Sequence, residues 1–215
     1  MLAMSPRAEQ KRQTRLALMH AALELMDSGR GFGSLSLREV TRSAGIVPTG
    51  FYRHFADMDA LGLALVAVVG QTFRATLRDV RRNEVAEQGL VGASTRIFLA
   101  AVQAHRSQFL FLAREQYGGS HRVRQAIATL RQGITDDLAA DLKLLQRMPD
   151  QSEPALELLA DLVVKTVFAT LPELIDPVTE ALPLHLHPAN KIVHQLRFIM
   201  DGGKHWPGPS KLHNF

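Results

Sequence analysis

The sequence predicts an all-α protein with an N-terminal helix-turn-helix segment followed by a larger helical bundle. Apolar residues recur at spacings of three and four in every periodic segment, which is the period of a helix. No segment shows the strict apolar and polar alternation of a half-buried strand. Two short helical patterns within residues 34–61 are joined by a glycine, as in a helix-turn-helix pair. These three observations together favour the all-α class.

Length and composition exclude several kinds of protein. The 215 residues are 46% hydrophobic, enough for one or two domains with a buried core. The absence of cysteine excludes disulfides and thiolate metal sites. The N-terminus lacks the apolar core of a signal peptide, and the longest apolar run, residues 61–70, is too short to span a bilayer. We therefore expect a soluble, cytoplasmic protein with no membrane partner.

The first helix is expected over residues 8–28. Leu18, Ala22, Leu25 and Met26 share its inward face, and Gly29 ends it. In the second helix, Ser36 stands three residues before Glu39, so the two side chains can form a capping box. Gly45 then supplies the turn. Phe32, between these helices, is expected to pack against the third one.

The third helix is expected over residues 48–55, with Pro48 at its first position. Phe51 and Phe55 fall on one side, which must be buried. The remaining face presents groups that can reach phosphates and base edges in a major groove: Thr49, Gly50, Tyr52, Arg53 and His54. The alternative is a solvated polar face on a small helix. The linked two-helix pattern favours DNA binding.

The distribution of charge agrees with a DNA-binding N-terminus. Residues 1–56 contain eight Lys or Arg and four Asp or Glu, whereas the rest of the chain is balanced. A basic leader that includes Lys11 and Arg12 is expected to follow the phosphate backbone or enter the minor groove, the alternative being a solvated terminus. Ser36 and Arg38 complete the predicted DNA-contacting set.

Residues 14–65 resemble the DNA-binding domain of the TetR family of bacterial repressors. The matching pieces are TRLALMHAALELMDSG, SLSLREVTRSAGI and GFYRHFADMDAL. The resemblance implies a DNA-binding domain at residues 1–57, with its motif at about 36–55. It also implies a ligand-binding and dimerisation domain at residues 58–215. The operator is then expected to be palindromic double-stranded DNA.

A fourth helix is expected over residues 58–82, with Asp57 as its N-cap. Further helices follow near residues 90–102, 107–117, 123–145, 153–175 and 188–202, and a proline-rich exposed loop covers 176–188. The helix at 153–175 is apolar on two sides, which favours a homodimer interface over burial within one chain. The residues predicted for that interface are Val163, Val167, Leu171, Leu174, Ile192, Leu196 and Ile199.

Neighbouring helices also supply large apolar side chains that could line a ligand tunnel or form an ordinary core. SLSLREV, AGIVP, FYRHF and LAREQYGGS are similar to the DesT and FabR type of TetR repressor, which controls unsaturated fatty acid synthesis. This resemblance implies a long-chain acyl-CoA effector, with unsaturated chains promoting and saturated chains relieving DNA binding. The predicted ligand residues are Phe98, Val102, Phe109, Leu112, Arg114, Tyr117, Arg122, Lys165 and Phe168.

Catalysis and metal binding are not expected. Nine histidines are present, but no HExxH motif occurs, and no GxSxG elbow accompanies the Ser, His and Asp residues. We therefore predict no enzyme activity, no metal and no cofactor. Two alternatives to an acyl-CoA-responsive repressor remain at this stage. One is a TetR-type repressor released by another apolar ligand, such as an efflux substrate, and the other is a DNA-bound adaptor without a small-molecule effector.

Overall fold

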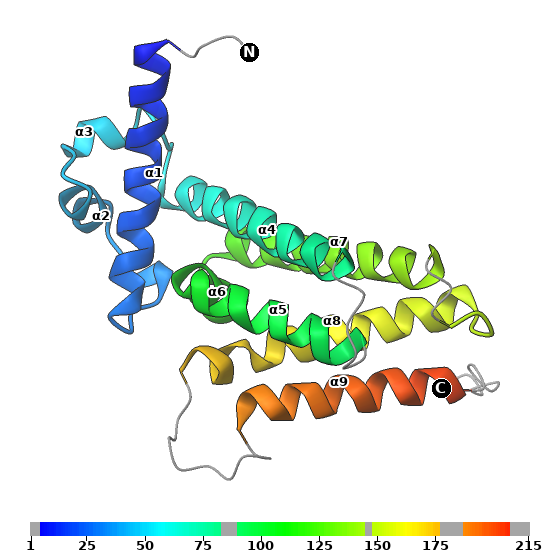
Figure 1. The fold of residues 1–215 in the computed structure, drawn as a ribbon. Coiled ribbons are helices and arrows are strands. Elements are labelled where there is room, and N and C mark those ends of the chain that lie inside the picture. Colours follow the sequence, from blue (N-terminus) through cyan, green and yellow to red (C-terminus); the bar gives the residue numbers. More distant parts are fainter. Residues whose placement is uncertain (1–4, 83–89, 145–147, 177–186, 207–215) are drawn as a thin grey trace. The chain divides into compact units, whose positions relative to one another are not determined.

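The structure is a computed structural model that describes residues 5–82, 90–144, 148–176 and 187–206 (Figure 1). Within these ranges every regular element is a helix, which confirms the predicted fold class. Most of the predicted proline-rich loop lies outside the described residues. The elements are α1 (Pro6–Asp27), the 3-10 turn η1 (Phe32–Ser34), α2 (Leu37–Ser43), α3 (Pro48–Phe51), α4 (Met58–Arg82), α5 (Leu90–Ala104), α6 (Arg106–Glu115), α7 (His121–Leu144), α8 (Glu153–Ile175) and α9 (Pro188–His205).

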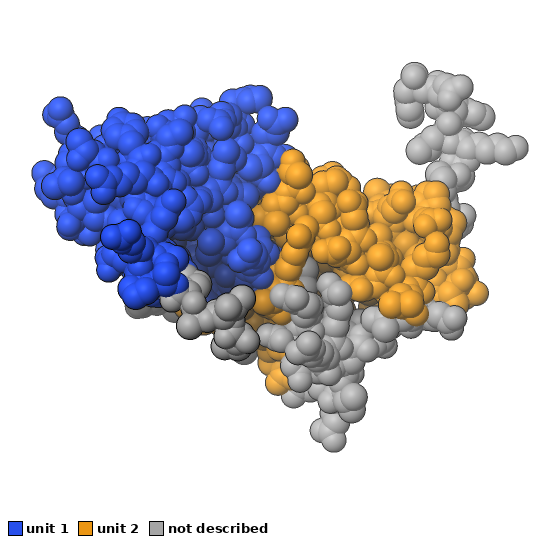
Figure 2. All heavy atoms as spheres, turned by 90° about the horizontal axis from the view of Figure 1, so that it is seen from above, with its two compact units in different colours: residues 1–73, 105–128 blue, residues 74–104, 129–215 orange. Residues whose placement is uncertain are grey.

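The chain forms two compact units, which Figure 2 shows in different colours. Unit 1 comprises residues 1–73 and 105–128, and unit 2 comprises residues 74–104 and 129–215. Unit 1 therefore contains α6 and the first part of α7 in addition to the helix-turn-helix segment. The functional boundary after residue 57 stays a prediction.

In unit 1, α2 packs against both α1 and α3 (Figure 1). Leu18, Ala22 and Met26 of α1 are fully buried, as their spacing predicts. Val40 of α2 and Phe51 of α3 are also fully buried. Burial of side chains this large contributes about 1.5–3 kcal/mol each, so this small core positions the two short helices.

Caps and turns in unit 1 occur at the residues that the sequence predicts. Ser36 and Glu39 form the complete capping box at the start of α2. Gly45 has a φ of +68°, the left-handed conformation that favours glycine, and it turns the chain from α2 into α3. The Oδ1 atom of Asp57 accepts a hydrogen bond of 2.6 Å from the backbone N–H of Ala60 and caps α4.

The third helix is shorter than predicted. Regular α-helix ends at Phe51. The N–H groups of Arg53 and His54 reach back three residues, to Gly50 at 3.3 Å and to Phe51 at 2.8 Å, whereas that of Phe55 reaches back four, to Phe51 at 3.0 Å. The chain therefore tightens after Phe51 and returns to a helical hydrogen bond at Phe55, which still places the two phenylalanines on one side.

Residues 58–76 of α4 are long and apolar enough to pass a length-and-composition test for a membrane span. Leu61, Leu65, Val69 and Phe73 of this segment are at most 3% exposed. Their spacing of four residues forms one buried stripe, as in a core helix of a globular protein.

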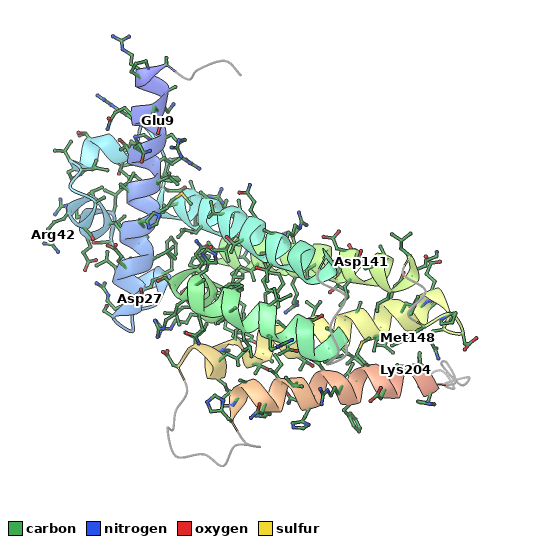
Figure 3. All side chains as sticks on the ribbon, viewed as in Figure 1. Glu9, Asp27, Arg42, Asp141, Met148 and Lys204 are labelled. Atoms are coloured by element: carbon green, nitrogen blue, oxygen red, sulfur yellow. The ribbon has the colours of Figure 1, made fainter. Side chains whose placement is uncertain are left out.

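In unit 2, α8 and α9 lie side by side (Figure 1). Gly203 permits their close approach, because a Cβ atom there would lie 2.8 Å from Cδ1 of Leu159. Leu159 belongs to a buried cluster with Leu142, Met148 and Leu156, and the position of Met148 is labelled in Figure 3.

The seven residues predicted for the dimer interface are buried or partly buried within the single chain. Leu171, Leu174 and Ile192 are buried within the single chain, and four more members of the set are partly buried: Val163, Val167, Leu196 and Ile199. Contact of these seven residues with a partner chain stays a prediction.

Candidate nucleic-acid interface and effector site

The segment from α3 to Phe55 has one buried side and one exposed side. Phe51 and Phe55 are 0% and 3% exposed, and their ring centroids lie 5.6 Å apart. Thr49 and Arg53 are exposed, and Tyr52 is 64% exposed. The two phenylalanines therefore anchor the segment from behind and leave a hydroxyl, a phenol and a guanidinium available to a ligand.

Gly50 has a packing role in this segment. It is only partly exposed, and a Cβ atom there would lie 2.8 Å from Cγ2 of Ile46. The absence of a side chain lets the start of α3 approach the turn that precedes it. Contact of Gly50 with DNA remains a prediction.

His54 is half-buried, and its Nδ1 atom has no hydrogen-bond partner among the described residues. Burial lowers the pKa of His54, and the positive charges of Lys11, Arg15 and Arg53 lower it further. The lowered pKa favours the neutral imidazole, which can accept or donate one hydrogen bond instead of acting as a cation. The negative charge of a phosphate bound beside His54 would raise its pKa again.

Arg15 connects α1 to the end of the recognition segment, a role that the sequence did not reveal. Its Nη1 atom donates to the backbone carbonyl of His54 at 2.8 Å. Its guanidinium carbon also lies 4.2 Å from the ring centroid of Phe55, a cation–π distance. The side chain therefore helps to position the segment that presents Arg53.

The basic residues near the N-terminus belong to α1 and not to an extended arm. The hydroxyl of Ser5 caps this helix, which begins at Pro6, so Lys11 and Arg12 lie on its exposed surface. Arg12 donates to both carboxylate oxygens of Glu9, the residue labelled in Figure 3, at 2.7 and 3.0 Å. Chiefly because of Arg12, the pKa of Glu9 falls to about 2.

The predicted contacts at the start of α2 differ in their local roles. Ser36 is engaged in capping, because its Oγ atom accepts from the N–H of Glu39 and donates to Oε2 of Glu39 at 2.7 Å. The Glu39 carboxylate also accepts from Arg30 at 2.7 Å. The hydrogen bonds from Arg30 and Ser36 lower the pKa of Glu39 to about 2. Arg38 is exposed.

Val47 is a further candidate that sequence reasoning missed. It occupies the N-cap position of α3 and is 67% exposed, two residues before Thr49. An exposed apolar side chain beside a recognition helix can contact the methyl group of thymine. An apolar residue directly before Pro48 is the sequence signal that could have identified it.

The apolar residues predicted for the effector site are all buried. Phe98, Val102 and Phe168 belong to unit 2, whereas Phe109 and Leu112 belong to unit 1. Each residue is at most 7% exposed. Burial agrees equally with a tunnel wall and with an ordinary core, so the tunnel stays a prediction.

The three cations of the predicted ligand set have partners within the chain, whereas the polar Tyr117 is exposed. Arg114 donates from Nη1 to the carbonyl of Met26 at 2.8 Å. Two other cations form ion pairs: Arg122 lies 3.5 and 3.9 Å from Asp57 and Asp59, and Lys165 lies 2.6 Å from Asp161. Tyr117 is 81% exposed.

The fold is similar to those of several solved regulators. A TetR-like transcriptional regulator from Rhodococcus sp. RHA1 is 20% identical with a TM-score of 0.64, over 93% of this chain and 98% of that one. AibR, solved with isovaleryl coenzyme A and operator DNA, is 15% identical with a TM-score of 0.60, over 85% and 97%. Thermus thermophilus FadR, a TetR-family repressor solved with lauroyl-CoA, is 20% identical with a TM-score of 0.54, over 87% and 94%.

Two family models match the sequence itself. Residues 18–65 match the model of bacterial regulatory proteins of the tetR family. Residues 88–202, more than half of the chain, match the tetracyclin repressor-like C-terminal domain. TetR-family proteins are transcriptional regulators and not enzymes. This chain belongs to the TetR family.

Proposed function

We propose that this protein is a homodimeric repressor of unsaturated fatty acid synthesis or desaturation genes, with long-chain acyl-CoA as its effector. The observation that supports operator binding most directly is the two-sided recognition segment. Phe51 and Phe55 are buried behind it, while Thr49, Tyr52 and Arg53 are exposed in front. The Tyr52 and Arg53 groups suit phosphates and guanine edges, and Thr49 suits either a phosphate or a base. Such a protein acts in the cytoplasm.

TetR regulators dimerise, and we propose that this chain does so through exposed apolar residues of α8 and α9. Leu158 and Leu162 of α8 are 43% and 45% exposed, and Phe198 of α9 is 82% exposed. Exposed large apolar side chains are typical of a partner surface. A dimer reads two half-sites of a palindrome, which roughly doubles the binding free energy before linkage costs.

The acyl-CoA proposal rests on the sequence resemblance and on two of the similar structures. AibR and FadR were solved with isovaleryl coenzyme A and lauroyl-CoA. The buried apolar residues Phe98, Val102 and Phe168 suit an acyl chain. A chain of one shape would stabilise the dimer geometry that fits the operator, and a chain of another shape would oppose it. The acyl-CoA can shift the equilibrium between the two dimer geometries only by the difference in its affinity for them.

The experiment is an operator selection followed by an effector titration. Purified protein selects binding fragments from the source genome, and fluorescence anisotropy then measures its affinity for a selected duplex. We expect oleoyl-CoA to strengthen binding and palmitoyl-CoA to weaken it. No effect from either thioester, with free coenzyme A as control, would refute the acyl-CoA proposal and leave operator binding intact.

One alternative effector class is favoured by a specific observation. Three of the five cations considered for the coenzyme A phosphates, Arg114, Arg122 and Lys165, have partners within the chain. An uncharged apolar ligand would not need these cations. Release of the operator by such a compound, with no response to acyl-CoA, would support this alternative. An adaptor without any effector would show neither response.

A further inference from the structure

A buried carboxyl group connects α6 to the turn before α2. Glu115, the last residue of α6, is 2% exposed. Its Oε1 atom accepts a hydrogen bond of 2.8 Å from the backbone N–H of Phe32, while its Oε2 atom has no hydrogen-bond partner among the described residues. Burial raises the pKa of this carboxyl group. A buried acidic group with an unsatisfied oxygen is costly, so its retention requires an explanation.

The Glu115–Phe32 hydrogen bond holds the start of η1. The ring of Phe32 packs edge-on against Phe111 of α6, with the centroids 5.7 Å apart and the planes at 88°. Gly62 of α4 also approaches this ring closely, since a Cβ atom there would lie 2.9 Å from Cε1 of Phe32. Phe32 therefore packs against α6 and α4. The packing of Phe32 against Phe51 and Phe55, expected from the sequence, stays a prediction.

A chain of polar contacts continues from η1 to the first helix of the DNA-binding pair. Arg30 donates from Nη2 to the carbonyl of Ser34 at 2.7 Å and from Nη1 to Oε1 of Glu39 at 2.7 Å. Oε2 of Glu39 accepts from the backbone N–H of Ser36 at 2.9 Å, within the capping box of α2. A displacement of η1 therefore acts on Arg30 and then on the start of α2.

The glycine pair after α6 shows how closely the Glu115 carboxyl group is confined. A Cβ atom on Gly118 would lie 1.9 Å from Oε2 of Glu115 and 3.1 Å from its Cα atom. A Cβ atom on Gly119 would meet nothing within 4 Å. Alanine at residue 118 must therefore displace the carboxyl group, whereas alanine at residue 119 leaves it in place.

We propose that Glu115 is a positioning residue for operator binding: through its hydrogen bond to Phe32 it holds η1, and through Arg30 and Glu39 it sets the position of α2. This inference rests on the proposed function as an operator-binding repressor. α2 packs against α3, so its position determines how the recognition segment is presented. The contact also links α6 to the DNA-binding segment within a single compact unit.

The test compares four variants at a temperature well below unfolding, with the active fraction titrated for each. Glu115→Gln keeps an acceptor oxygen for Phe32 and should bind the operator within about twofold of wild type. Glu115→Asp withdraws the acceptor by one methylene and should bind about tenfold more weakly, the effect of losing one buried hydrogen bond. Gly118→Ala should weaken binding similarly, and Gly119→Ala should not.

Amide hydrogen exchange provides a second readout that does not require DNA. The N–H of Phe32 and the first amides of α2 should exchange faster in Glu115→Asp and Gly118→Ala than in wild type, with Gly119→Ala unchanged. Operator affinity and exchange that are equal to wild type in Glu115→Asp and Gly118→Ala would overturn the proposal. Wild-type protein that binds no duplex would refute operator binding instead, and the exchange result would still decide the role of Glu115 in holding η1.

Discussion

Replacement of Phe198 by alanine should strongly weaken the dimer. The ring of Phe198 is 82% exposed on α9, and the exposed polar residues Lys191 and His194 precede it at helical spacing. If two copies pair through this surface, each ring leaves water when the dimer forms. The two-fold symmetry of such an interface places the same substitution on both sides. The dimer therefore loses the burial free energy of two phenylalanine rings, one from each copy.

The magnitude follows from the burial of one phenylalanine. Complete burial of such a side chain contributes about 2 kcal/mol, so the symmetric loss is about 4 kcal/mol for the dimer. Since each 1.4 kcal/mol is about a tenfold change, dimerisation of Phe198→Ala should be weaker by about a thousandfold. Incomplete burial in the interface reduces this value in proportion to the area that stays in water.

Sedimentation equilibrium over a range of protein concentrations measures the dimer dissociation constant directly. Tyr117→Ala is the matched control, because Tyr117 is 81% exposed but lies outside α8 and α9. This control should dimerise as the wild type does. A Phe198→Ala protein whose dissociation constant is within threefold of wild type would refute the proposed interface and the reasoning from exposed apolar residues.

Three further substitutions test separate parts of the DNA-binding unit. Lys11→Ala should reduce the slope of log affinity against log salt by about one unit if Lys11 meets a phosphate, and an unaltered slope would exclude that contact. The lowered pKa of Glu39 implies that its carboxylate stabilises the fold above pH 4.5 and that this stability is lost as the pH falls toward about 2. Between these pH values, the urea midpoint of Glu39→Gln should therefore vary less with pH than that of wild type. Phe51→Ala should lower the free energy of unfolding by about 3–5 kcal/mol in urea titrations, whereas Tyr52→Ala, at an exposed position, should change it by less than about 0.5 kcal/mol.

Elements defined by local chemistry were predictable from the sequence. The capping box of Ser36 and Glu39, the turn at Gly45 and the cap at Asp57 depend on residues three or four positions apart, and all occur in the structure. The burial of Phe51 and Phe55 also follows from their separation by one helical turn.

Contacts between distant segments were not predictable in the same way. The hydrogen bond between Glu115 and Phe32 joins residues 83 positions apart, and no local sequence pattern predicts it. The surface of α8 that meets a partner could not be predicted for a related reason. Periodicity identifies an apolar stripe but does not say whether the same chain or a partner covers it, and Leu171 proved to be internal while Leu158 is exposed.

The affinity of the Arg53→Ala variant for a genome-selected operator tests the central claim most directly. Arg96→Ala provides the control for net charge, since Arg96 is an exposed arginine on α5. Wild type and Arg96→Ala should bind the duplex equally, and Arg53→Ala should bind at least about tenfold more weakly, as expected for a lost base or phosphate contact. Equal binding by all three proteins would contradict the assignment of this face to operator recognition.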